Sequence, residues 1–446
     1  MELLTKFIDE AKIDSKEFYE YILDVDNSEL SEFIKVLNDI ISESYSSKSK
    51  HSNFSFITND TLSGHSFPCS EVECKLGNVD TLIRNAILYA DKVYIQNPFE
   101  TYYEYKEFNE NLRLEIIGDL IVLNKIKPLL KEGIFEYATT KVHFCSECYK
   151  KFEDKYLKTL YSNIKTIEPY LLQHLQSNID FYAHWKYDTI GVEIIDKSDL
   201  LSHSQVVNFV EYVPDAINKV AVKGKSVKLS KSEVEKSGVL YYLLNHIEKN
   251  LHFQDYYSAY YNCHLLTDRN FDIELLKLVN NDVYEKHTKE SEILKNLDHM
   301  VPFIDSVPIN KLLKLRKEEG ESFEVYRDKL SKLIQVKNLS SKESKQLFNE
   351  EIRPEINKMN LTLSNNKKVV WGNIKSNIFL ASTYISATLF AGILPANIDK
   401  IVASVGGFGF AKNIGQDVLS LLKNQEIRKN EFYFLWKIQK DNKIKI

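Results

Sequence analysis

Four cysteines lie in two pairs whose spacing suits a metal ion. Cys69 and Cys74 form a C-x4-C pair in "PCSEVEC", and Cys145 and Cys148 form a C-x2-C pair in "FCSEC". A C-x2-C loop presents two thiolates toward one point, and four such ligands satisfy the tetrahedral geometry of Zn²⁺. We therefore predict a structural zinc site at these four residues. The alternative is four unrelated thiols, because a buried cysteine also behaves as a small apolar residue.

Acidic residues near apolar strand patterns predict a second kind of site. The apolar run in "HLLTDRNF" ends in Asp268, and Asp91, Glu115 and Asp119 could converge on it. Metal-dependent nucleases of the PIN kind gather carboxylates at strand ends, where two divalent cations activate water. These four acids are therefore the candidate catalytic group of such a nuclease. Against this, neutral Asn97 ends "KVYIQ" where a carboxylate is wanted, and Asp after a strand is also an ordinary turn residue.

Other enzyme motifs are absent from the sequence. We find no GxxxxGK[ST], GxSxG, HExxH or kinase-like set, and "GGFGFAKNIG" follows no strand pattern. The net charge of −5 argues against a protein that coats nucleic acid through charge alone. The motif search therefore identifies no enzyme class beyond the nuclease candidate.

An almost charge-free region near the C-terminus raises the question of a membrane. Uncharged residues run from Ser376 to Ile398 and from Ile401 to Ala411, with Asp399 and Lys400 between them. The first segment is long enough to span the hydrocarbon. The charged pair at the tip, however, would cost about 2.5–3.5 kcal/mol per charge on insertion. We predict an apolar helical hairpin that is either buried in the C-terminal domain or inserts into a membrane when triggered.

Two basic groups are candidate anion-binding surfaces. One lies on a β-hairpin predicted around Gly224 and consists of Lys219, Lys223, Lys225, Lys228 and Lys231. The other interleaves Arg428, Lys429, Lys437, Lys440, Lys443 and Lys445 with Phe432, Tyr433, Phe434 and Trp436. The first could meet phosphates, and the second suits an anionic membrane surface or nucleic acid. Solvated surface, with a docked aromatic tail in the second case, explains them equally well.

The elements that must position these residues alternate between helix and short apolar strand. Residues 1–45 show three amphipathic helix patterns, followed by a Ser- and Lys-rich linker. Between residues 54 and 283, helix patterns alternate with the strand patterns "KVYIQ", "IFEYATT" and "CHLLTD", which is typical of an α/β layer. Strand patterns largely vanish after residue 283.

The predicted fold class is therefore α+β and mainly helical. It comprises an N-terminal helical region at 1–45, an α/β domain at 54–283 with the cysteine cluster, and a helical C-terminal domain at 284–446 with the apolar hairpin. The start "MELLTKFIDEAK" lacks the basic and apolar regions of a secretory signal, and the five cysteines do not suggest a disulfide framework. We predict a cytoplasmic protein, at the periphery of the inner membrane if the hairpin meets lipid.

Three phrases carry a resemblance: "LYADKVYIQNPF", "LKLRKEEGESFEVYRDKL" and "NEFYFLWKI". Together they resemble a loosely defined group of uncharacterised bacterial proteins, some of them associated with anti-phage or stress loci. The resemblance carries no catalytic motif, so it implies a role in defence or stress and assigns no residue.

The leading hypothesis is a non-enzymatic intracellular effector or interaction protein in anti-phage defence, whose hairpin engages membranes. The alternatives are a metal-dependent, PIN-like nuclease and a zinc-stabilised scaffold that binds a partner protein. The candidate partners are an unidentified protein, a membrane surface, nucleic acid and further copies of the chain in a homo-oligomer.

Overall fold

The chain divides into two compact units, Met1–Lys295 and Asn296–Ile446. The computed structural model describes residues 2–13, 15–43, 54–65, 71–103, 105–139, 177–186, 189–197, 205–209, 212–269, 271–272, 307–334, 341–360 and 430–444, with a few single residues between these ranges. The protein is mainly helical with two small sheets, which confirms the predicted α+β class. The predicted apolar hairpin and Cys69, Cys145 and Cys148 lie outside the described residues.

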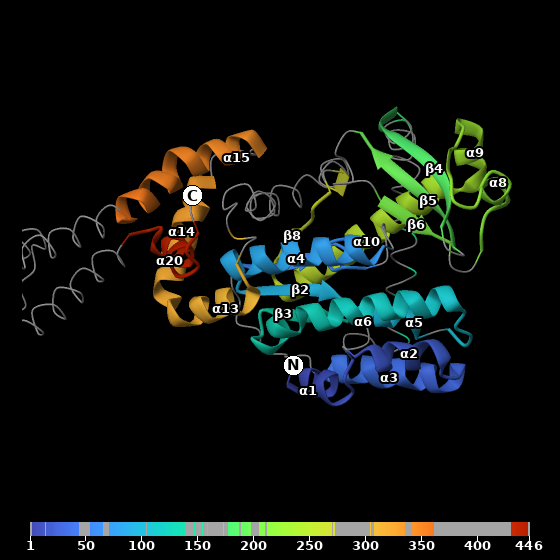
Figure 1. Ribbon diagram of the computed structural model, residues 1–446, viewed down its shortest axis with the longest axis horizontal. Coiled ribbons are helices and arrows are strands. Elements are labelled where there is room, and N and C mark those ends of the chain that lie inside the picture. Colours follow the sequence, from blue (N-terminus) through green and yellow to red (C-terminus); the bar gives the residue numbers. More distant parts are fainter. Residues whose placement is uncertain are drawn as a thin grey trace, which may run out of the picture. The chain divides into compact units, whose positions relative to one another are not determined.

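Three amphipathic helices form an N-terminal layer of the first unit. They are α1 (Glu2–Glu10), α2 (Lys16–Asp24) and α3 (Asn27–Glu43). The Ser15 side chain begins α2 by accepting a hydrogen bond from the backbone N–H of Phe18 at 3.1 Å. The layer packs against α5 (Phe99–Tyr102) and α6 (Glu110–Lys131), as Figure 1 shows. The three helices predicted in this region are therefore confirmed.

The first sheet contains four parallel strands in the order β3-β2-β1-β8. They are β1 (Ser55–Thr58), β2 (Lys92–Gln96), β3 (Phe135–Ala138) and β8 (His264–Leu266). Helix α4 (Val72–Tyr89) joins β1 to β2, α5 and α6 join β2 to β3, and α10 (Val239–Tyr261) leads into β8. The three strands predicted from "KVYIQ", "IFEYATT" and "CHLLTD" are confirmed.

Helices cover both faces of this sheet. On one face the Phe56 ring contacts Tyr89 of α4, with centroids 6.2 Å apart. On the other face Tyr94 stacks on Tyr261 of α10, with centroids 3.9 Å apart. A sheet buried on both faces requires continuous apolar strands, which is what the runs in β1 and β2 supply.

The strand order changes direction at β1. The chain proceeds from β1 through β2 to β3 on one side, and β8 then pairs with the free side of β1. In open α/β sheets, such a topological switch point opens a crevice beyond the carboxyl ends of the strands, where ligands bind. The position between β1 and β8 is therefore the place to look for a site.

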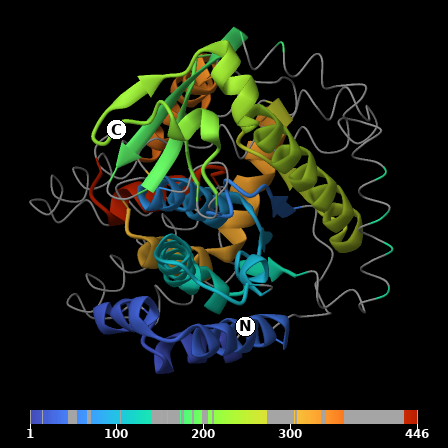
Figure 2. The same cartoon turned by 90° about the vertical axis from the view of Figure 1, so that its right-hand side faces the viewer.

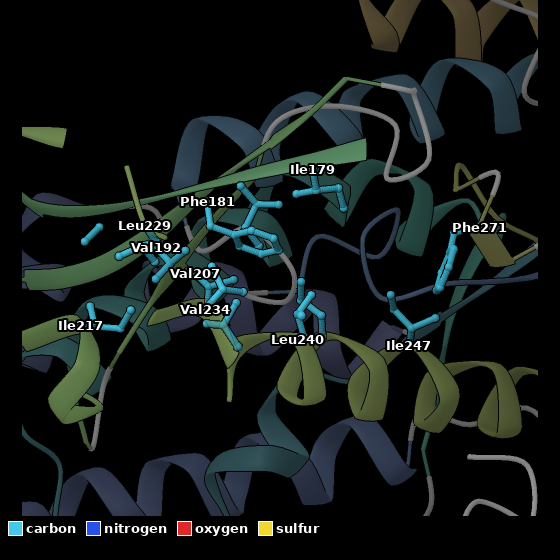
Figure 3. Packing of buried hydrophobic residues seen from close by; sticks show 14 residues of the cluster. Ile179, Phe181, Val192, Val207, Ile217, Leu229, Val234, Leu240, Ile247 and Phe271 are labelled. Carbon is cyan, nitrogen blue, oxygen red and sulfur yellow. The ribbon is translucent and has the colours of Figure 1, made fainter. Parts of the chain in front are cut away.

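The second sheet is antiparallel, in the order β6-β5-β4-β7. Its strands are β4 (Ile179–Lys186), β5 (Thr189–Asp196), β6 (Gln205–Asn208) and β7 (Ser226–Lys228). One face packs on α8 (Asp215–Asn218), α9 (Lys231–Ser237) and the first half of α10. Figure 3 shows this core, in which Phe181 and Val207 lie above Leu240 of α10.

The prediction of a β-hairpin around Gly224 is wrong, because the residues on its two sides do not pair with each other. Strand β7 pairs with β4 rather than with the residues just before Gly224. The reason is that Val220 and Ala221 both donate backbone hydrogen bonds to Ile217 and so continue the turn of α8. The nearby segment is therefore not extended, and β7 finds its partner elsewhere.

The second unit is helical within its described residues. It contains α13 (Ile309–Glu318), α14 (Gly320–Ile334), α15 (Ser341–Leu347) and α20 (Tyr433–Asp441). A π-helical turn, η3 (Phe348–Ile352), follows α15 and precedes Pro354. None of the helices in the described parts of the chain is long and apolar enough to cross a membrane.

The C-terminal aromatic residues belong to the core of this unit. Phe432, Tyr433, Phe434 and Trp436 are buried, and the Trp436 indole N–H donates to the Asn360 side chain at 2.9 Å. The segment is thus a docked helix. Its aromatic side chains are packed inside the protein, and only its charged residues lie toward solvent.

Candidate functional site

A buried polar network fills the switch point between β1 and β8. Asn59 follows β1 directly, and Thr267 and Asp268 follow β8, so all three lie at the carboxyl edge of the sheet. The Asn59 side-chain N–H₂ donates to the Thr267 hydroxyl at 3.0 Å and to the Asp268 carboxylate at 2.8 Å. One amide therefore ties the two strand ends together and orients Asp268.

Arg269 is the centre of this network and is fully buried. Its guanidinium lies 3.0 Å from the Asp60 carboxylate and 3.0 Å from that of Asp272. Asp272 also accepts a hydrogen bond from the Thr267 hydroxyl at 2.5 Å, and Asn250 of α10 accepts from Arg269 at 3.4 Å. A buried ion pair persists only where hydrogen bonds of this kind offset its desolvation. Arg269 thus holds two carboxyl groups in fixed positions beside Asp268.

The two carboxyl groups do not have ordinary affinities for protons. Burial raises the pKa of Asp60 to about 7, and Arg269 offsets this only in part, while Asp272 and Asp268 add to the rise. Burial likewise raises the pKa of Asp272 against the effect of Arg269. Buried carboxyl groups with raised pKa values beside a specific charged partner cluster at functional sites, which supports Asp60 as part of the candidate site.

A second polar group lies between α4 and α6. Lys75 and Asp119 are both buried, with the Lys75 ammonium 2.7 Å from the Asp119 carboxylate. The Tyr102 hydroxyl donates to the same carboxylate at 2.6 Å. Burial lowers the pKa of His65 against the effect of Asp119, and its ring contacts the backbone oxygen of Gln96 at 3.1 Å. This group reaches the carboxyl end of β2.

Glu115 and Tyr242 lie between the two groups. Glu115 is half-buried one turn before Asp119 on α6, and burial raises its pKa to about 7 against the effect of Lys75. Partial burial raises the pKa of Tyr242 of α10 to about 12, and the negative charges of Glu115, Tyr105 and Asp60 add smaller contributions. Tyr242 is therefore close enough to feel the charge of Glu115 and of Asp60, so it lies between the two polar groups.

His246 extends this edge along α10. Its ring lies 4.3 Å from that of Tyr242, measured between centroids. Burial lowers its pKa to about 4, with Lys249 and Arg269 adding to the effect. A neutral imidazole and a phenol therefore stand beside the carboxylates.

Three of the four predicted catalytic acids lie along this edge. Asp268 belongs to the β1–β8 network, and Glu115 and Asp119 belong to the group between α4 and α6. Asp91 does not join them, because it precedes β2 and donates its backbone N–H to the Phe54 oxygen. A strand of five residues separates the two edges by about 16 Å, so Asp91 lies at the opposite edge of the sheet.

The structure also bears on the predicted metal sites. Across the residues that the structure describes, no group of three or more His, Cys, Asp or Glu side chains is placed to hold a metal ion. Cys74 lies half-buried in α4, while its three predicted zinc partners fall outside the described ranges. The zinc site therefore stays a prediction.

Sequence reasoning missed the residues that organise the edge. These are Asn59, Asp60, Lys75, Asn250, Arg269 and Asp272. A local signal existed for Asp60, because "SFIT" is a short apolar run followed by "ND". The ion pair between Asp60 and Arg269 joins residues more than 200 positions apart, and no local pattern predicts it.

Comparisons with protein-family models, with curated proteins and with solved structures found no match for this chain. The chemistry of the site therefore rests on its own geometry.

Proposed function

We propose that the protein is a non-enzymatic cytoplasmic effector whose first unit binds a small polar ligand at the carboxyl edge of the parallel sheet. The observation that carries this proposal is the buried Arg269 bridging Asp60 and Asp272 at the switch point. Buried ionic networks contribute little to stability compared with apolar side chains of similar volume. Such a network at the ligand-binding position of an open α/β sheet supports a role in recognition.

The chemistry of the edge favours a ligand that donates hydrogen bonds. The groups with some exposure include the carboxylates of Asp268 and Glu115, the phenol of Tyr242 and the imidazole of His246. Carboxylates accept hydrogen bonds and attract positive charge. Sugar hydroxyls, as in a nucleoside, and primary amines both meet this requirement.

Thermal unfolding of the full-length protein with two probes tests the proposal: adenosine, which offers sugar hydroxyls, and spermidine, which offers amines. We expect at least one probe to raise the unfolding temperature of the wild type. Asp268→Asn should lower the affinity for that probe by about tenfold, because the substitution removes a charged hydrogen-bond acceptor. Asp255→Asn, an exposed position on α10, is the matched control and should bind as the wild type does. Equal binding by Asp268→Asn and the wild type would contradict the proposal.

A metal-dependent nuclease is the second candidate. Asp60 and Asp268 follow adjacent parallel strands, which is the setting in which nucleases of the PIN kind gather carboxylates. The test is cleavage of single- and double-stranded nucleic acid with Mg²⁺ or Mn²⁺. Cleavage that disappears in Asp268→Ala and persists in Asp255→Asn would favour this candidate over the ligand-binding effector.

The effector part of the proposal concerns the apolar segment from Ser376 to Ala411. The resemblance to proteins of anti-phage loci and the near absence of charge support a membrane-engaging role at the inner membrane. Liposome flotation and dye release, with the intact protein and a variant lacking this segment, test the idea. Flotation of both proteins, or of neither, would contradict a membrane role for the segment.

The zinc-stabilised scaffold is the third candidate. Its support is the spacing of Cys69, Cys74, Cys145 and Cys148. Elemental analysis tests this candidate. We expect one zinc ion per chain in the wild type and in Cys263→Ser, and none in Cys74→Ser.

A further inference from the structure

The N-terminal layer has a more negative net charge than the chain as a whole. Residues 1–43 contain 12 Asp and Glu against four Lys, a net charge of −8. The whole chain has a net charge of −5, so the other 403 residues together carry +3. An asymmetry of this size between one layer and the rest indicates a surface that meets a partner of opposite charge.

The same layer presents partly exposed apolar side chains from all three helices. We define the aromatic face as Leu3, Phe7, Phe18, Tyr21, Phe33 and Val36. Each helix contributes two of them at a spacing of three or four residues, so each pair lies on one side of its helix. Leu3 is 47% exposed, and Tyr21 and Val36 are each 38% exposed.

Ring contacts join the three helices into one continuous face. Phe33 of α3 lies 6.2 Å from Phe7 of α1 and 5.5 Å from Phe18 of α2, measured between ring centroids. Phe18 lies 6.0 Å from Tyr21, whose hydroxyl donates to Glu29 at 2.6 Å. The acidic side chain of Glu29 is thus hydrogen-bonded to a residue of the aromatic face. Among the described elements of the first unit, none covers the outer side of this layer (Figure 1 and Figure 2).

Charge decides which partner this face fits. An anionic membrane and nucleic acid would be repelled by a layer whose residues 1–43 carry a net charge of −8. A second copy of the chain would bring the same acidic face against itself in a two-fold dimer. The chain's own basic segment at 428–445 cannot supply the apolar half of the contact, because Phe434, Leu435 and Trp436 are buried in the second unit.

We propose that the aromatic face and its acidic rim form a docking surface for a basic amphipathic helix of a partner protein. Such a helix places an apolar stripe on Phe7, Phe18 and Phe33, and its flanking Lys and Arg side chains meet acids such as Glu17 and Glu29. This is helix recognition through apolar anchors, with charge complementarity setting the specificity. The surface is separate from the carboxyl edge of the sheet, so this inference does not depend on the ligand-binding function.

The test uses the full-length protein and synthetic helical peptides of about five turns. The probe is an amphipathic Lys/Leu peptide, and the controls are a Glu/Leu peptide of the same pattern and a Lys/Leu peptide in scrambled order. We expect only the amphipathic Lys/Leu peptide to bind, with affinity falling as salt is added.

Two kinds of variant separate this surface from a general attraction of an acidic protein for a basic peptide. The double variant Tyr21→Ser with Val36→Ser should weaken binding at least about fivefold, because it removes apolar contact area. Tyr212→Ser is the matched control, since Tyr212 is 69% exposed outside this layer, and it should bind as the wild type does.

The charge reversal Glu17→Lys alters an exposed position and should weaken binding without disturbing the ring contacts, whereas Glu29→Lys should weaken binding and also removes the acceptor of the Tyr21 hydroxyl. Circular dichroism confirms that each variant folds. Equal affinities for the apolar double variant and Tyr212→Ser, or equal binding of the scrambled peptide, would overturn the proposal.

Discussion

Glu115 has a carboxyl group whose ionisation costs free energy in the folded protein. Burial raises its pKa from 4.5 to about 7, so between these values the folded state binds more protons than the unfolded state. Its contribution to stability is therefore present at low pH and is lost as the pH rises toward 7. We compare the free energy of unfolding of Glu115→Gln with that of the wild type. We expect this difference to shift in favour of the variant by about 2 kcal/mol as the pH rises from about 5 to about 8. Urea unfolding across this range measures the difference, and a gain that does not depend on pH would contradict the prediction.

The control for this measurement is Glu110→Gln. Glu110 lies on the same helix and is exposed. Its difference from the wild type should not change across the same pH range.

Arg269 offers a second test at the scale of one residue. Its replacement by Met leaves Asp60 and Asp272 buried without a positive charge, which costs about 3–5 kcal/mol. The cost should be smaller at low pH, because Asp60, with a pKa of about 7, then takes up a proton. Guanidinium unfolding at pH 5 and pH 8 gives both values. Arg84→Met, which breaks a pair with the partly exposed Asp80, should cost less than about 1 kcal/mol at either pH.

Strand β5 depends on a glycine for its contact with β6. A Cβ atom at Gly191 would lie 2.7 Å from the Val207 oxygen and 2.6 Å from the Asn208 side-chain oxygen. Because backbone cannot yield as a flexible side chain does, Gly191→Ala should lower stability by about 1–3 kcal/mol. Gly77→Ala in α4 is the matched substitution and should raise stability. Nothing lies within 4 Å of the added Cβ atom, and glycine inside a helix is about 1 kcal/mol less stable than alanine. Thermal unfolding of the two variants should therefore shift in opposite directions.

Elements that stabilise themselves locally were predictable from the sequence. The strands of the parallel sheet are short continuous apolar runs, and α4, α6 and α10 show helical periodicity. The end of α6 was also predictable, because a glycine follows its last apolar residues in the sequence. In the structure Gly133 adopts the left-handed conformation, with φ 71°, that favours glycine beyond the end of a helix. Elements that depend on distant partners were not predictable. Strand β7 pairs with β4 some 40 positions away, and the aromatic run of α20 suits a strand as well as a helix until its packing partners are known.

The candidate site divides along the same line. Asp268, Glu115 and Asp119 were predictable, because acids after a strand or on a neighbouring helix form local patterns. Asp91 precedes β2, whereas the other acids follow or flank the carboxyl ends of strands. Because β1 and β2 run parallel, Asp91 lies at the opposite edge of the sheet, and the parallel pairing cannot be seen in a local sequence pattern. Asp60 was missed because its role depends on the distant Arg269.

At the scale of the whole molecule, each unit has its own core, and the second unit is closed by residues from the end of the chain. Phe434 of α20 contacts Phe323 and Tyr326 of α14, with ring centroids 5.1 and 5.6 Å apart. The Phe434→Ala cavity should cost about 3–5 kcal/mol. Because the chain forms two compact units, we expect the loss to stay within the second.

Hydrogen exchange detected by mass spectrometry locates this loss. In Phe434→Ala, amide exchange should rise in α13 and α14 and stay unchanged in β1 and β2 of the parallel sheet. Asp441→Asn is the control in the same helix, because Asp441 is exposed and its ion pair with Lys437, at 3.2 Å, lies near the surface, so exchange should change little in either unit. A rise in β2 equal to that in α14 would mean that the two units unfold together, and their separate cores would then not be separate units of stability.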